Sequence, residues 1–202
     1  MIDYLATFIF FFAVIDPIGT VPVFIAVTSK YTEKVKRKIA IQAALVSSLI
    51  LIFFIIAGEV ILTAIDVPLA SFQIAGGIVL FLFALSMIFG ESKPDEELKS
   101  VDSSHETAIF PLAVPSIASP GAMLAAVLMT ENTQFTFMQQ FQTTLVMLSV
   151  MIVVLLLMLT STFIHRFIGN AGASIISRVM GLILSSVAIN NILEGITVYF
   201  SL

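Results

Sequence analysis

The stretch Ile15-Asp16-Pro17-Ile18-Gly19-Thr20-Val21-Pro22 places a carboxylate and two prolines inside an apolar run that extends from Tyr4 to Thr28. As a helix, this run would measure about 37 Å at ~1.5 Å per residue, which is enough to cross a hydrocarbon layer of ~30 Å. Asp16 then lies at mid-depth, where an ionisable group is unfavourable unless it is paired or hydrated. We therefore predict that this stretch forms a functional site within a membrane span.

A second apolar run, from Ala108 to Thr130, repeats this pattern with Pro115-Ser116-Ile117-Ala118-Ser119-Pro120-Gly121 at its centre. Asp16-Pro17 and Ser119-Pro120 each combine a preferred N-cap residue with proline at the first helical position, which is typical of a helix start. The pattern predicts that each run consists of two half-helices that meet at mid-membrane.

The composition is that of an integral membrane protein. Of 202 residues, 59% are hydrophobic and only 11% are charged, and the mean hydropathy is +1.11. These values exclude a soluble globular protein of this length. The chain has no cysteine, which excludes disulfides and thiolate chemistry. We expect a single membrane domain over residues 1–202.

Six apolar runs are long enough to span the membrane as helices. They cover residues 4–28, 40–65, 69–89, 108–130, 142–163 and 175–200. With six spans, the basic residues all fall on one side: Lys30, Lys34, Lys36, Arg37, Lys38, Lys93, Lys99, Arg166 and Arg178. By the positive-inside rule that side is cytoplasmic, so both termini should be extracytoplasmic. Re-entrant hairpins at the two broken runs would separate Arg166 and Arg178 from the other basic residues, so the charges favour full crossings.

The two halves of the chain are related by a repeat. Pro17 matches Pro120 at an offset of 103 residues, and Gly77 matches Gly181 at an offset of 104. Because each half has three spans, the halves must be inverted relative to each other. We predict an all-α integral membrane fold with six transmembrane helices in a 3+3 inverted-topology repeat, in which helices 1 and 4 are broken at mid-membrane. Repeat 1 covers about 1–90, repeat 2 about 108–202, and a cytoplasmic loop, 91–107, joins them.

Several further motifs follow one another along nearly the whole chain. They are Asp16-Pro17-Ile18-Gly19, Val21-Pro22-Val23-Phe24, Gly58-Glu59, Ala75-Gly76-Gly77-Ile78, Pro115 followed by Gly121-Ala122, Arg178-Val179-Met180-Gly181 and Glu194-Gly195. Together they resemble the MarC family. The resemblance implies a small bacterial inner-membrane protein with six helices, and some members of the family are described as neutral amino acid transporters. The chain departs from the family pattern at Gln73, where arginine is usual.

The two half-helix starts define a candidate binding site. In a six-span topology the half-helices that begin at Pro17 and Pro120 run in opposite directions, so their N-termini converge at mid-membrane. Each N-terminus has unpaired N–H groups and a partial positive charge, which suit an anionic group such as an amino acid carboxylate. The candidate substrate-binding residues are Asp16, Pro17, Gly19, Thr20, Ser119, Pro120, Gly121 and Asn190.

Asp16 and Glu59 are the candidate coupling-ion residues, for a proton or Na⁺. As a cap, Asp16 would accept a first-turn N–H; turned away, it would hold an ion or a substrate ammonium group, and the sequence leaves both roles open. Glu59 either lines an outer vestibule or extends its carboxylate to the interface. Asn190 and Glu194 either line a path or hydrogen-bond a neighbouring helix. Proline kinks alone would explain the prolines but not Asp16.

These features predict a secondary transporter for small zwitterionic solutes, with neutral amino acids as the leading substrate class. A channel for a small solute or ion is the alternative, because half-helix dipoles also line selectivity filters. An enzyme is not expected, because Asp16 is the only central aspartate and no His-Glu-x-x-His motif is present. The expected partners are the substrate and membrane lipid, without nucleic acid, metal or cofactor, and a homo-oligomer stays open.

Overall fold

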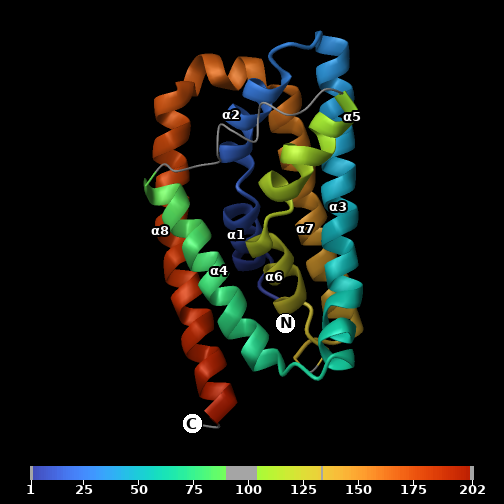
Figure 1. Ribbon diagram of the computed structural model, residues 1–202, viewed down its shortest axis with the longest axis vertical. Helices are drawn as coiled ribbons and strands as arrows, with labels where there is room; N and C mark the ends of the chain where they lie inside the picture. Colours follow the sequence, from blue (N-terminus) through green and yellow to red (C-terminus); the bar gives the residue numbers. More distant parts are fainter. Residues whose placement is uncertain (1, 90–103, 133, 201–202) are drawn as a thin grey trace.

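The computed structural model describes residues 2–89, 104–132 and 134–200, which form a bundle of helices (Figure 1). In chain order the elements are α1 (Tyr4–Ile15), α2 (Pro17–Thr28), α3 (Glu33–Ala64), α4 (Leu69–Phe89), α5 (Ser104–Thr107), η2 (Ala108–Ile117), α6 (Pro120–Leu128), α7 (Phe137–Leu159) and α8 (Ser161–Phe200). No strand occurs within the described ranges. Most of the loop predicted to join the repeats lies outside them.

Six passages can be traced along the described part of the chain. Five helices are long and apolar enough to cross a membrane: Tyr4–Thr28, Glu33–Ala64, Leu69–Phe89, Phe137–Leu159 and Ser174–Phe200. The pair η2 and α6, bent by 56° at the break between them, supplies a sixth passage. In Figure 1 the α2–α3 and α7–α8 connections lie at the upper end and the α3–α4 and α6–α7 connections at the lower end, so consecutive passages alternate in direction. The predicted all-α membrane fold with a broken fourth run is confirmed.

The two breaks differ in form. α1 and α2 are separated by Asp16 alone and together count as one span of 25 residues. In contrast, η2 is a π-type helix interrupted by extended backbone at Phe110 (φ −128°, ψ 128°) and Val114 (φ −132°, ψ 128°). Each of these residues precedes a proline, which disfavours the helical conformation of the residue before it. The two predicted halves of the fourth run are present, and the backbone of the first half is irregular.

The connection before the last span also differs from the prediction. The Gly- and Asn-containing stretch around His165 to Gly172 predicts a link, but the backbone there is helical and α8 begins at Ser161. In Figure 1 the first part of α8 lies across the upper end before the helix turns downward. The glycines in this stretch lower helix propensity by only about 1 kcal/mol each, which does not by itself end a helix.

α4 and α8 lie side by side and cross on glycines (Figure 1). A Cβ at Gly77 would lie 3.1 Å from the carbonyl oxygen of Ala188, and a Cβ at Gly181 would lie 2.9 Å from that of Ala84. Gly77 and Gly181 are 104 residues apart, and so are Ala84 and Ala188, so the contact is symmetric at the offset found in the sequence. The missing side chain at each glycine permits this close approach of the two backbones.

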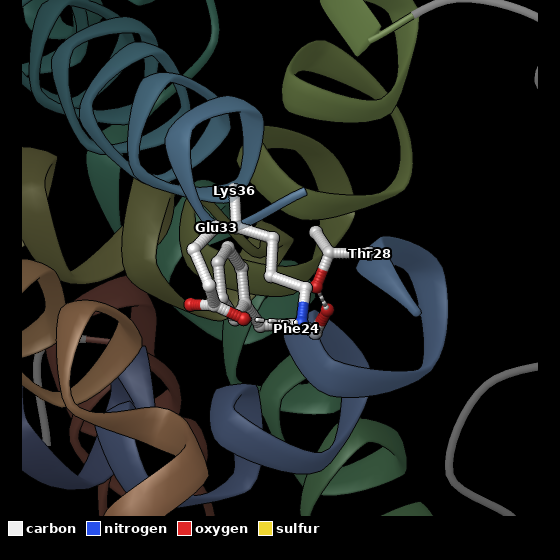
Figure 2. Close-up of polar contacts among 4 residues, drawn as sticks. All are labelled: Phe24, Thr28, Glu33 and Lys36. Atoms are coloured by element: carbon white, nitrogen blue, oxygen red, sulfur yellow. Dashed lines mark hydrogen bonds and ion pairs between the residues drawn. The ribbon is translucent and has the colours of Figure 1, made fainter. Parts of the chain in front are cut away.

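Figure 2 shows how α2 ends and α3 begins. Thr28, which is buried, donates its hydroxyl to the carbonyl oxygen of Phe24 one turn earlier. Beyond the short connection, Lys36 pairs with Glu33 at 2.9 Å in the first turn of α3. Glu33 also lies at a helix N-terminus, where a negative charge is favourable. Phe24 is only 2% exposed, so α2 is held in the core up to its last turn.

Candidate functional site

Asp16 ends one helix and starts the next. Its backbone N–H donates to the Phe12 carbonyl oxygen at 3.0 Å, which closes α1, and its φ of 49° turns the chain. Its Oδ1 accepts the Gly19 N–H at 2.9 Å and so caps α2, whose first residue is Pro17. The Thr20 hydroxyl donates to the Asp16 carbonyl oxygen at 3.1 Å. Of the two roles that the sequence leaves open, capping is present, and it holds the carboxylate at the break.

Ser119 caps α6 in the same way, but in a fully buried position. Its Oγ accepts the Ala122 N–H at 3.1 Å, and α6 begins with Pro120. The hydroxyl also donates to the carbonyl oxygen of Val14 at 3.4 Å. Because Val14 is in the last turn of α1, this bond joins the two breaks. Ser119 itself is 0% exposed.

A cavity of about 170 Å³ lies where the two breaks meet. It is lined from α2, α4, η2 and the start of α6, by Asp16, Gly19, Thr20, Val23, Phe83, Ser86, Met87, Pro115, Ser116 and Pro120. This space is large enough for several water molecules or one small solute. The α2 residues in this lining lie in the first two turns after the break, and the α4 residues lie toward the C-terminal end of that helix. Both helices run toward the upper end of Figure 1. The cavity therefore occupies the half of the molecule that carries the α2–α3 connection.

The lining of this cavity is mostly apolar with a few polar groups. The polar side chains are those of Asp16, Thr20, Ser86 and Ser116. The Ser86 hydroxyl donates to the carbonyl oxygen of Phe83 at 2.7 Å, so its oxygen retains the capacity to accept. A concave, largely apolar site with a few converging polar groups is the usual form of a small-molecule site.

The structure brings several predicted substrate residues together. Asp16, Gly19, Thr20 and Pro120 line the cavity. Pro17, Ser119 and Gly121 lie in the same two helix starts but are buried by their neighbours. A Cβ at Gly121 would lie 2.7 Å from Leu80, so this glycine admits α4 close to the start of α6.

Two other predicted residues lie away from the cavity. Asn190 is exposed on α8. Glu59 on α3 accepts the Asn132 N–H at 2.8 Å in the α6–α7 connection. Gln73 donates to Glu194 at 3.3 Å, which links α4 to α8. Glu59 as a coupling-ion residue stays a prediction, and the cavity contains neither Glu59 nor Asn190.

Sequence reasoning missed the contribution of α4. Phe83 and Met87 are ordinary apolar residues for a span, and Ser86 is a weakly polar residue near its end. One signal in the sequence pointed to Ser86. It lies 104 residues before the candidate residue Asn190, so the two occupy matching positions of the two repeats. The other cavity residues that were not predicted are Val23, Pro115 and Ser116.

Known proteins resemble the chain over its whole length. A family model described as MarC family integral membrane protein matches residues 1–200. A UPF0056 membrane protein of Methanocaldococcus jannaschii is 33% identical over 197 residues, which cover 96% of this chain and 95% of the relative. A UPF0056 membrane protein of Buchnera aphidicola subsp. Schizaphis graminum is 30% identical over 200 residues, with 99% of each chain covered. No solved structure matches the chain. The chain belongs to the MarC family of integral membrane proteins.

Proposed function

We propose that this MarC family protein is a secondary transporter for small zwitterionic solutes, with neutral amino acids as the first class to test. The observation that carries the proposal is the cavity at the meeting point of two half-helix starts. In inverted-repeat transporters, substrates with anionic groups are held at such broken helices near the bilayer midplane. The size and the mostly apolar lining of the cavity suit one small solute.

The substrate carboxylate would bind between the first turns of α2 and α6. The first residue of each helix is proline, which has no N–H, and each cap accepts the N–H at the third position. We therefore assign the carboxylate to the cavity side of these two first turns, which Gly19, Thr20 and Pro120 line. The positive ends of both helix dipoles favour the same negative charge.

Asp16 would bind the opposite charge. Its Oδ1 accepts the Gly19 N–H, and its side chain lines the cavity. An ionised carboxylate has two oxygens and accepts several hydrogen bonds at once, so capping and coordination are compatible. We assign to Asp16 the substrate ammonium group or the coupling ion, either a proton or Na⁺.

Burial beyond the second break favours a transporter over a channel. Ala122 and Ala126, in the first two turns of α6, are 0% exposed, and so is Ser119 at the break itself. A channel needs a continuous path, whereas a transporter keeps its central site closed on one side at a time. The cavity lies on one side of the breaks, and the buried residues Ser119, Ala122 and Ala126 close the other side. This arrangement supports alternating access.

The proposed orientation places the basic connections in the cytoplasm and both termini outside. A reporter fused after Leu202 should then be extracytoplasmic, and one inserted in the 91–106 loop should be cytoplasmic. A cytoplasmic C-terminus together with a cytoplasmic 91–106 loop would contradict the six-span inverted repeat.

Flux through purified protein in liposomes tests the proposed function. We expect uptake of at least one labelled neutral amino acid that saturates with concentration and shows counterflow, with protein-free liposomes as the control. Flux that rises linearly without counterflow would favour the channel. The absence of flux across a panel of neutral amino acids, with and without proton and Na⁺ gradients, would refute the proposed substrate class.

A further inference from the structure

We propose that α8 forms one wall of a second access crevice, which is the repeat-related counterpart of the cavity; Asn190 and Asn191 line this wall, and the opposite wall, on α6, is packed shut in this structure. This inference rests on the proposed function, because alternating access requires a second route to the central site.

The position of the crevice on α8 follows from the symmetric crossing of α4 and α8. The glycine contacts relate the two helices at an offset of 104 residues. The cavity residues of α4, Phe83, Ser86 and Met87, then correspond to Val187, Asn190 and Asn191 of α8. Position 86 lies nine residues after Gly77, and position 190 nine residues after Gly181. At 3.6 residues per turn, both lie about half a turn around the helix from the crossing.

The second wall of the crevice follows from the two helix starts, which are related at an offset of 103 residues. Gly19 and Val23 on α2 correspond to Ala122 and Ala126 on α6. The first two are half-buried and line the cavity, whereas both alanines are 0% exposed.

The two prolines show the same difference in exposure. Pro120 is exposed at the cavity, and its counterpart Pro17 is buried. At these helix-start positions, the burial pattern is that of one open half and one closed half of a symmetric pair. Exchange of the two arrangements would close the present cavity and open its counterpart between α6, α8 and α1.

The chemistry of α8 fits a hydrated crevice better than a lipid-facing surface. Asn190 is exposed and Asn191 half-buried within the Ser174–Phe200 span. Neither side chain hydrogen-bonds to another residue in the described part of the chain. Amide groups left without partners in hydrocarbon are strongly unfavourable, so they indicate contact with water or a polar solute. Two amides offer both donors and acceptors to a zwitterion that passes along this face.

The chain contains no cysteine, so single-cysteine variants report access without background. Ser86→Cys and Asn190→Cys would be treated with a charged, membrane-impermeant maleimide in sealed right-side-out and inside-out membrane vesicles. Leu182→Cys, at an exposed apolar position two turns before Asn190, is the control for lipid-facing positions. We expect Ser86→Cys and Asn190→Cys to react from opposite faces of the membrane and Leu182→Cys to react from neither.

Three outcomes would overturn the inference: no reaction of Asn190→Cys from either face, reaction from the same face as Ser86→Cys, or oxidation of Asn190→Cys to a disulfide-linked dimer. The last would assign this face of α8 to contact with a second copy of the chain. Each variant is first shown to be monodisperse in detergent, so that misfolding is not mistaken for inaccessibility. The labelling does not depend on solute flux, so failure of the proposed function and failure of the crevice are read from separate measurements.

Discussion

The helix starts at Asp16 and Ser119 use the same capping device and differ in charge and exposure. Each residue accepts the N–H three positions later and is followed by proline. Asp16 is half-buried and lines the cavity, whereas Ser119 is 0% exposed and bonds across to α1. A cap does not need a charge, as Ser119 demonstrates. The charge at Asp16 therefore requires an explanation beyond the helix start, and the cavity beside it provides one.

The crossing of α4 and α8 contrasts with the helix starts. There the two repeats make matching close contacts from glycine to backbone carbonyl. The two repeats make symmetric contacts where α4 crosses α8, and they differ from each other around the cavity. We infer that the crossing is structural and that the differences between the two starts carry the function.

The largest expected effect is that of Asp16→Asn on transport. Asparagine still accepts the Gly19 N–H, so the helix start should persist, but the charge that would hold the ammonium group or coupling ion is lost. A charge-assisted hydrogen bond of ~1.5–3 kcal/mol corresponds to a loss of flux of about 10- to 100-fold. Liposome flux of the purified variant, compared with that of Ser119→Ala, measures this.

Ser119→Ala removes a cap without removing charge, so its flux should fall by less than about tenfold. If folded Asp16→Asn protein transports as well as the unmodified chain, the charge is irrelevant and Asp16 is only a cap. Equal losses in the two variants would instead assign both effects to the helix starts.

The next effect concerns stability at the crossing. Gly181→Ala would push a Cβ to within 2.9 Å of the Ala84 carbonyl oxygen, a backbone atom that cannot turn aside. We expect a loss of ~1–3 kcal/mol in unfolding free energy, measured by denaturant unfolding in micelles, and a similar loss for Gly77→Ala. Leu182→Ala, at an exposed position of α8 next to Gly181, is the control and should change stability by less than ~0.5 kcal/mol. Unequal losses of unfolding free energy for Gly77→Ala and Gly181→Ala would contradict a symmetric crossing of α4 and α8.

The smallest effect is expected for the buried cap. Ser119→Ala should lower the unfolding free energy by about 1 kcal/mol, because the Ala122 N–H loses its acceptor and the bond to Val14 is lost. Ser86→Ala is the control, because Ser86 bonds only within its own helix turn and should change stability by less than ~0.5 kcal/mol. Denaturant unfolding in micelles compares the two variants. Equal losses of unfolding free energy would mean that the Ser119 cap and its bond to Val14 do not stabilise the protein.

The helix starts could be predicted from sequence because capping is local. Asp16-Pro17 and Ser119-Pro120 contain the whole signal in two residues each, and the structure confirms both caps. The role of α4 could not be predicted in this way, because the cavity depends on which face of α4 meets α6. That face is fixed by contacts such as that of Gly121 with Leu80, which join residues far apart in the chain.

Two further differences have identifiable causes. The irregular backbone of η2 results from Pro111 and Pro115, which disfavour helical backbone at the residues before them, Phe110 and Val114. The placement of Asn190 depends on the rotation of α8 about its axis. Its spacing from Glu194 shows that the two share a face, but the neighbour of that face is set by the packing at Gly181.

The crossing of α4 and α8 also bears on how the protein is made. Synthesis proceeds from the N-terminus, so α4 enters the membrane long before α8, its partner from the other end of the chain. Until α8 emerges, the backbone at Gly77 has no Ala188 carbonyl against which to pack. A nascent chain that stops short of α8 therefore leaves uncovered the face of α4 at Gly77 that α8 covers in the finished protein. α8, which is synthesised well after α4, completes this crossing.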